Sequence, residues 1–222
     1  MHHQYALRVP RDRSRLEAAL GPQSSWSRSC LLPYPRDVDA AIDALADAAR
    51  SSDRGAARRT LAAIDDGWMR SWFCDVASYS GIHRSEMIGR STPRGRPTRR
   101  RSPRRGLEYA KLAESHHRCW YCGIRLAHWN VLGKIRDRLG HDVLPWGRSN
   151  AARHGLLIMI RANFDHVQPL ASSGRDDADN IVASCWCCNY GKWRFDPSEV
   201  GLTEIRREPW PSWPGWDGLS NA

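Results

Sequence analysis

Four of the seven cysteines are arranged in two pairs with the spacing of metal ligands. Two residues separate Cys119 from Cys122, and the same spacing recurs between Cys185 and Cys188. Four thiolates complete the tetrahedral coordination of a structural zinc ion, Zn2+. The two pairs therefore predict one four-cysteine zinc site. An odd number of cysteines in 222 residues also fits a reducing compartment better than a disulfide scaffold.

A closed four-cysteine site leaves no coordination position for a substrate, so any chemistry needs further residues. One stretch holds candidates around the second cysteine pair: Asp165, His166, Asn180, Asn189 and Lys192. An isolated Asp-His step is usually a solvated dipeptide, and paired cysteines also occur in zinc ribbons without catalysis. The informative feature is that the Asp-His step, the two asparagines, the lysine and the cysteine pairs occur together and in this order.

This stretch strongly resembles the HNH nuclease family. The resemblance covers about residues 116–195 and includes both cysteine pairs, the Asp-His step, the middle Asn, the final Asn and the trailing Lys. Asn189 stands where many members have His, a variant that also occurs in the nuclease domain of CRISPR effectors. The segment from Ile124 to Asn163 is longer than in compact members.

The resemblance implies a second metal ion and assigns a role to each residue of the motif. Asp165 and Asn189 would be ligands of a hard divalent ion, for which Mg2+ suits the oxygen ligands. His166 would be the general base that takes a proton from the attacking water. The metal would stabilise the leaving 3′-oxygen. Asn180 would order the loop that fixes His166, and Lys192 would contact phosphate.

The sequence around the motif agrees with the ββα-metal arrangement of that family. Residues 156–167 are expected to form the first strand, residues 168–179 a loop and residues 180–183 the second strand. Ser184 would cap a short helix. At about 100° per residue, Cys187 lies about 160° from Asn189 around that helix, so it points away and is expected to be a buried thiol.

The Asp-His step constrains the first strand. In a regular strand Asp165 and His166 would face opposite sides, so their joint use requires the strand to end or bend there. The other histidines have no comparable context, although His117 or His128 would be able to replace a cysteine ligand.

A basic segment indicates contact with nucleic acid. The chain has 34 Lys and Arg residues against 24 acidic ones, for a net charge of +10. Eight of these ten charges lie between Arg84 and Arg105, including the run Arg99, Arg100 and Arg101. Such a cluster suits phosphate contacts with DNA. The alternative is a linker whose arginines reflect only composition.

The sequence predicts an α+β protein with three regions. Residues 1–83 carry two helical stripes, one from Val38 to Ala49 and one from Leu61 to Trp72, and have no assigned role. Residues 84–106 form the Arg- and Pro-rich linker. Residues 107–222 form an HNH nuclease module stapled by the four-cysteine site, with a tail whose tryptophans are expected to anchor it by packing.

The function that these features favour is a metal-dependent DNA endonuclease that leaves 5′-phosphate and 3′-hydroxyl ends. The alternatives are a zinc-stapled DNA-binding module without catalysis, and a nuclease subunit that docks a protein partner through the helical region. Double-strand cleavage needs two active sites, which a homodimer would supply. The chain has no run of about 18 uncharged apolar residues and no signal-peptide pattern, so we expect a cytoplasmic protein without a membrane span.

Overall fold

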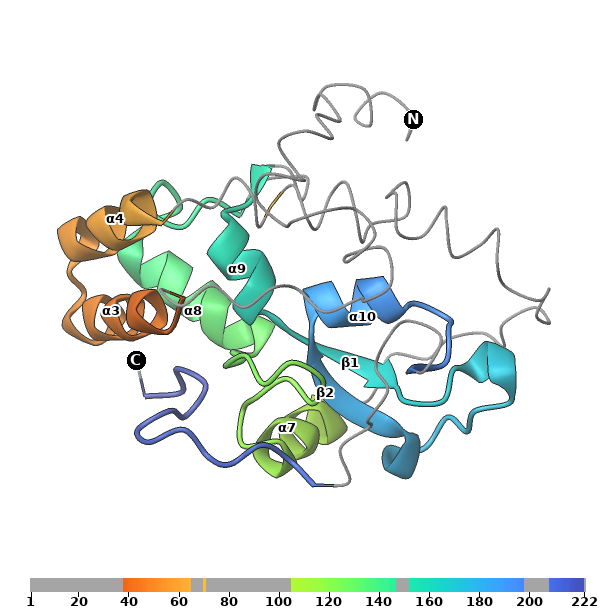
Figure 1. Ribbon diagram of the computed structural model, residues 1–222. Coiled ribbons are helices and arrows are strands. Elements are labelled where there is room, and N and C mark those ends of the chain that lie inside the picture. The colour runs from red at the N-terminus through yellow and green to blue at the C-terminus, as the bar shows by residue number, and fades with distance from the viewer. Residues whose placement is uncertain (1–37, 65–69, 71–104, 147–151, 198–207, 222) are drawn as a thin grey trace.

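The computed structural model describes residues 38–64, 70, 105–146, 152–197 and 208–221. Figure 1 shows helices around a small two-stranded antiparallel sheet, which confirms the α+β class. In chain order the elements are α3 (Val38–Ser51), α4 (Arg54–Ala63), α7 (Arg105–Glu114), α8 (Trp129–Leu139), α9 (Gly155–Ile160), β1 (Ala162–His166), η3 (Leu170–Ser172), η4 (Ala178–Asn180), β2 (Ile181–Cys185) and α10 (Trp186–Lys192).

The helices α3 and α4 form a hairpin, in which α3 contains the first predicted stripe, whereas α4 contains only the start of the second predicted stripe, at Leu61. The apolar stripe of the first helix is buried, namely Val38, Ile42, Leu45 and Ala49. The side chain of Asp53 accepts the backbone N–H of Ala56 at 2.8 Å and so caps the start of α4. Leu61 is buried on the second helix, whereas Trp68 and Trp72 lie outside the described residues.

Arg125 ties this hairpin to the rest of the described chain. Its buried guanidinium donates to the carboxylates of Asp39 and Asp43 on α3. On another side it lies over the rings of Trp213 and Trp216, at 4.5 and 5.0 Å from their centroids. A buried charge is tolerated only when its donors are satisfied. The helical and C-terminal regions thus share one apolar core where they are described, and the boundaries drawn between them stay predictions.

The C-terminal segment is held by tryptophans, as the sequence predicts. Residues 208–221 contain no helix or strand, and Figure 1 shows this segment in dark blue near α7. Trp210 Nε1 donates to the carbonyl of Trp120 at 3.1 Å, and Trp216 Nε1 donates to the carbonyl of His117 at 3.2 Å. The segment is therefore anchored to the turn that carries the first cysteine pair.

The first strand is shorter than the sequence predicts. Residues 156–160 of the expected strand belong instead to the helix α9 (Gly155–Ile160), whose six residues are all buried. The ring of His154 caps it by accepting the backbone N–H of Leu156 at 3.2 Å. A continuous apolar run fits a buried helix as well as a buried strand, and here the cap and the packing favour the helix. The strand itself is Ala162–His166.

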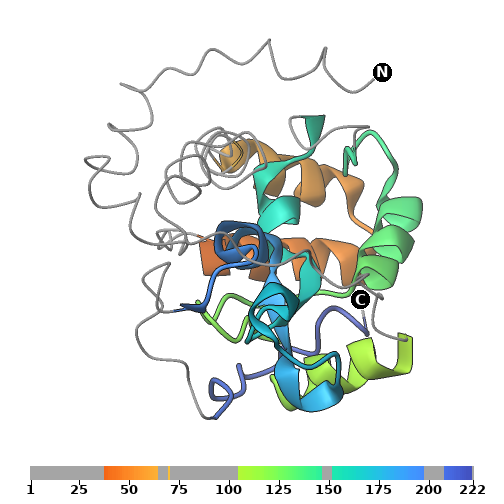
Figure 2. The same ribbon diagram turned by 90° about the vertical axis from the view of Figure 1, so that its right-hand side faces the viewer.

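The remaining ββα elements follow the expected order. β1 pairs with β2 in an antiparallel register that sets Asp165 opposite Val182 and His166 opposite Ile181. The strand ends at His166, as the use of two adjacent side chains requires. α10 packs against both strands (Figure 1 and Figure 2). Its N-cap is Cys185 rather than the predicted Ser184, whose buried hydroxyl has no hydrogen-bond partner among the described residues.

The long segment from Ile124 to Asn163 contains the helix α8. This helix begins after the N-cap His128 and ends at the C-cap Gly140, which has a φ of 103°. None of the helices in the described ranges is both long and apolar enough to span a membrane.

Candidate active site and metal centre

The four cysteines predicted as zinc ligands lie together. One sulfur from each of Cys119, Cys122, Cys185 and Cys188 lies within 4.8 Å of the others. The sulfurs of Cys122 and Cys185 are 3.8 Å apart. A tetrahedral ion with metal–sulfur bonds of about 2.3 Å would space its ligands by about 3.8 Å. The cluster therefore has the dimensions of a metal site, and among the described residues neither His117 nor His128 belongs to it.

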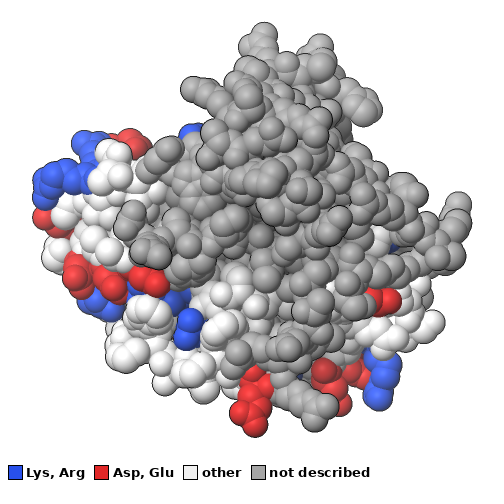
Figure 3. Space-filling view, viewed as in Figure 1, with Lys and Arg blue, Asp and Glu red and all other residues white. Residues whose placement is uncertain are grey.

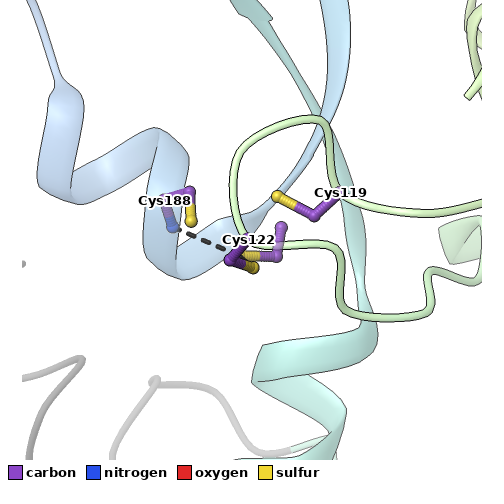
Figure 4. A group of neighbouring side chains, drawn as sticks. Cys119, Cys122 and Cys188 are labelled. Atoms are coloured by element: carbon purple, nitrogen blue, oxygen red, sulfur yellow. Dashed lines mark hydrogen bonds between the residues drawn. The ribbon is translucent and has the colours of Figure 1, made fainter. Parts of the chain in front are cut away.

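Local backbone geometry presents these sulfurs. Figure 4 shows Cys119 and Cys122 on a turn that faces Cys188 on α10. The turn is closed by two backbone hydrogen bonds, from Cys119 N to Ile124 O and from Gly123 N to Cys119 O, both 2.8 Å. Gly123 has a φ of 76°, and a Cβ there would come within 2.9 Å of the Trp210 ring. The turn therefore needs glycine at this position.

The pKa values of the four cysteines are shifted by burial and by their contacts with one another. Burial acts to raise the pKa of the Cys119 thiol, but hydrogen bonds with the other three cysteines outweigh it and lower this pKa well below its usual value. Hydrogen bonding with Cys119 raises the pKa of Cys122 and of Cys188, and burial raises the pKa of Cys185. The four thiols therefore shift one another's pKa values in opposite directions. A bound metal ion would be needed to deprotonate all four.

The end of β1 carries a buried carboxylate. Asp165 is 7% exposed, and its Oδ2 accepts the Tyr121 hydroxyl at 2.7 Å. The same oxygen lies 3.0 Å from Lys192 Nζ. Among the described residues no hydrogen bond reaches the other carboxylate oxygen, Oδ1. Asp165 is therefore fixed through one oxygen.

Lys192 is buried instead of lying at the surface. Its side chain is 0% exposed, and its ammonium donates to the carbonyl of His166 at 2.8 Å besides pairing with Asp165. Both residues that the ammonium contacts, Asp165 and His166, are themselves buried. A contact of Lys192 with phosphate stays a prediction, and it would require the ammonium to leave these partners.

His166 is oriented by a carboxylate that the sequence reasoning missed. His166 Nε2 lies 2.9 Å from Asp176 Oδ1. A carboxylate oxygen accepts hydrogen bonds, so this contact gives the donor role to Nε2, and in the corresponding neutral tautomer Nδ1 is the acceptor. His166 is buried, and Asp176 is exposed in the loop before η4. This arrangement leaves one ring nitrogen able to accept a proton.

Two asparagines complete the arrangement. Asn180 Oδ1 accepts the backbone N–H of Gln168 at 2.8 Å, and its Nδ2 donates to the carbonyls of Gln168 and Arg175 at 2.9 and 2.7 Å. It thus makes the bonds across the loop that the resemblance implies. Asn189 on α10 donates from Nδ2 to the carbonyl of Phe164 at 3.2 Å, which leaves its amide oxygen for another partner.

The stretch that contains the Asp-His step and the second cysteine pair matches one family model. Residues 154–194 match the HNH endonuclease family. We call residues 154–194 the HNH segment. It spans α9, both strands, the loop between them and α10, and it lies C-terminal to the first cysteine pair. No curated protein and no solved structure gives a significant match. Nuclease activity is what the HNH segment suggests in general.

The loop of the HNH segment depends on a glycine. A Cβ on Gly174 would lie 2.0 Å from the carbonyl oxygen of Gln168, which is backbone and cannot move away cheaply. Gly174→Ala should therefore lower the free energy of unfolding by about 1–3 kcal/mol. The matched control is Gly133→Ala inside α8, where nothing lies within 4 Å of the new Cβ. It should stabilise by about 0.5–1 kcal/mol. Urea unfolding of both variants measures the difference, and equal stability of Gly174→Ala and wild type would contradict the prediction.

The predicted DNA-contacting arginines lie outside the described residues: Arg99, Arg100 and Arg101. On the face in Figure 3 the described residues present acidic and basic side chains next to one another. The residues missed by sequence reasoning are Tyr121 and Asp176. Tyr121 lies between two cysteines of the cluster, and Asp176 lies two residues after Gly174 in a polar loop, so their positions near the motif were the available signal.

Proposed function

We propose that this protein is a metal-dependent endonuclease that hydrolyses phosphodiester bonds of DNA and leaves 5′-phosphate and 3′-hydroxyl ends. The observation that carries the proposal is the HNH segment with an oriented histidine beside a buried carboxylate. His166 bonds to Asp176 through Nε2, and the adjacent Asp165 keeps one oxygen without a described partner. A module that only binds DNA has no need for this combination.

The proposed roles follow from the contacts. Asp165 and Asn189 would supply oxygen atoms to one divalent ion, with Mg2+ as the proposed ion. That ion would supply charge stabilisation for the leaving 3′-oxygen and for phosphorus. His166 accepts a proton from the attacking water at Nδ1, because Asp176 holds Nε2 in its protonated form. Asn180 holds the loop that carries Asp176, so it acts through His166.

The four-cysteine cluster has a structural role in this proposal. Zinc is the proposed ion because four thiolates in a tetrahedral array suit it and leave no position for substrate. The described cysteines are free thiols, which metal ligation requires, and this fits the reducing cytoplasm as the proposed compartment. A protein partner for the helical hairpin, and a homodimer with two active sites, are parts of the proposal that solution mass measurements would test.

The deciding experiment is incubation of purified protein with supercoiled plasmid in Mg2+ or in EDTA. Methylated and unmethylated plasmid should both be used, because the sequence gives no recognition site. We expect nicked or linear plasmid in the incubation with Mg2+ and uncut supercoiled plasmid in the incubation with EDTA. A protein that shifts plasmid in a gel but never cuts it would favour the zinc-stapled binding module.

A variant of the metal ligand separates ion binding from proton transfer. Asp165→Asn keeps an acceptor for Tyr121 and Lys192 but loses the charge that attracts the divalent ion. We expect it to need higher Mg2+ concentrations and to recover part of its rate at high Mg2+. Thermal melting serves as the folding control. A variant with an unchanged Mg2+ requirement would remove Asp165 from the proposed ligand set.

The arginine run is proposed to contact phosphates without reading bases. Replacing Arg99, Arg100 and Arg101 by Gln should weaken plasmid binding and flatten its salt dependence by up to about 0.9 per lost phosphate contact. The control carries the same charge change on exposed positions of α4: Arg54, Arg58 and Arg59. An equal effect of both triple variants would mean that only net charge matters, and an unchanged salt slope would make the segment a linker.

A further inference from the structure

The tyrosine inside the first cysteine pair reaches from the metal cluster to the candidate active site. Tyr121 lies between Cys119 and Cys122 in sequence, and its side chain is buried. Its hydroxyl donates to Asp165 Oδ2 at 2.7 Å, across 44 positions of the chain. A tyrosine places its hydroxyl at the end of a rigid ring, so the position of this donor is set by the backbone turn that carries it.

The contacts at Asp165 leave one oxygen for a metal ion. The Tyr121 hydroxyl donates a hydrogen bond to Oδ2, and the Lys192 ammonium forms an ion pair with the same oxygen at 3.0 Å. Oδ1 is then the oxygen that is available to a cation. Ligating carboxylates generally depend on such outer hydrogen bonds for their orientation. Tyr121 differs from Lys192 because it is neutral, so its removal changes orientation without changing the charge of the site.

The cysteine cluster is also connected to Asn189, the second proposed ligand of the divalent ion. Asn189 follows Cys188 directly on α10, and the cap bond from Cys188 N to Cys185 Sγ fixes the first turn of that helix. Both proposed ligands of the divalent ion are therefore attached to the cluster. Asn189 is attached through the backbone, and Asp165 through the Tyr121 hydroxyl.

We infer that Tyr121 is a positioning residue that transmits the fixed geometry of the four-cysteine cluster to Asp165 and thereby sets the affinity of the catalytic site for its divalent ion. This inference rests on the proposed function, because it assumes that Asp165 binds such an ion. It adds a link between the two metal sites. Removing the hydroxyl loosens Asp165 while the cluster stays intact.

The test uses full-length, zinc-loaded protein and Mn2+ as a spectroscopic probe of the divalent site. Titration followed by electron paramagnetic resonance gives a dissociation constant that does not depend on activity. Tyr121→Phe removes only the hydroxyl and keeps the ring. The matched control is Tyr109→Phe on α7, which makes the same chemical change at an exposed tyrosine that does not contact Asp165. Asp165→Asn defines binding that does not involve the carboxylate.

We expect Tyr121→Phe to raise the Mn2+ dissociation constant about tenfold or more, as the loss of an outer partner of a ligand typically does. Its zinc content and melting temperature should match those of wild type, and the Mg2+ concentration for half-maximal cleavage should rise by a similar factor. Tyr109→Phe should behave as wild type in every measurement.

The inference is overturned if Tyr121→Phe binds Mn2+ as wild type does, or if its zinc content falls in proportion to its Mn2+ affinity. These outcomes leave the proposed function standing, because wild type would still bind Mn2+ through Asp165. If wild type and Asp165→Asn bind Mn2+ equally, the divalent site of the proposed function fails and the inference fails with it.

Discussion

His166→Ala is expected to lower the rate of plasmid cleavage by about 10² to 10⁴-fold, the usual contribution of a general base. The substitution removes the ring whose Nε2 bonds to Asp176 and whose Nδ1 is the proposed proton acceptor. Zinc content and plasmid binding should stay near wild type, since the His166 side chain contacts neither the cysteine cluster nor the arginine run within the described residues. Single-turnover cleavage with excess protein measures the loss.

A matched control for this prediction is His141→Ala. His141 is exposed after the end of α8, and within the described ranges it bonds only to Asp137 on the same helix. The His141→Ala protein should cut plasmid at the wild-type rate. Cleavage by His166→Ala at that same rate, with contaminating nuclease excluded by a mock purification, would overturn the catalytic scheme.

Cys188→Ser is expected to release the zinc and unfold the segment that contains the motif. A structural zinc ion contributes on the order of 10 kcal/mol to the folding of small metal domains. Cys188 is fully buried in the cluster on α10, so its loss also frees the helix from the cysteine turn. Elemental analysis and thermal melting measure the two effects together, and Cys119→Ser should behave in the same way.

The adjacent Cys187 provides the control for this second prediction. It is equally buried but lies outside the four-cysteine group. Cys187→Ser should keep one zinc per chain and lose only the modest stability expected for a hydroxyl in an apolar position. A Cys188→Ser protein that lacks zinc and melts like wild type would show that the cluster does not support the fold.

The cysteine cluster was predictable because metal coordination imposes short, regular spacing on a sequence. The pairing of the strands and the position of α10 followed from the same motif. The helix α9 was not predictable, since its six apolar residues carry no periodicity that distinguishes a helix from a strand. The cap contributed by His154 became recognisable only from its contact with Leu156.

The contacts that orient the candidate site were hidden from the sequence for a different reason. Tyr121 and Lys192 meet at Asp165 from opposite directions along the chain, and no local pattern marks a residue as the partner of another so far away. Burial also changed the interpretation of Lys192, because a lysine after the motif suggested phosphate contact whereas the fold encloses it. Asp176 was one of several acidic residues in a polar loop, so its pairing with His166 needed the structure.

The buried guanidinium of Arg125 has a consequence for how the described parts unfold. Its acceptors belong to the hairpin, and the rings that cover it belong to the C-terminal segment. Detaching either one would leave a cation facing an incomplete set of partners, which is costly away from water. We therefore expect the helical hairpin and the C-terminal segment to melt cooperatively, in one transition, so that the hairpin acts as part of the same folding unit as the segment that covers Arg125.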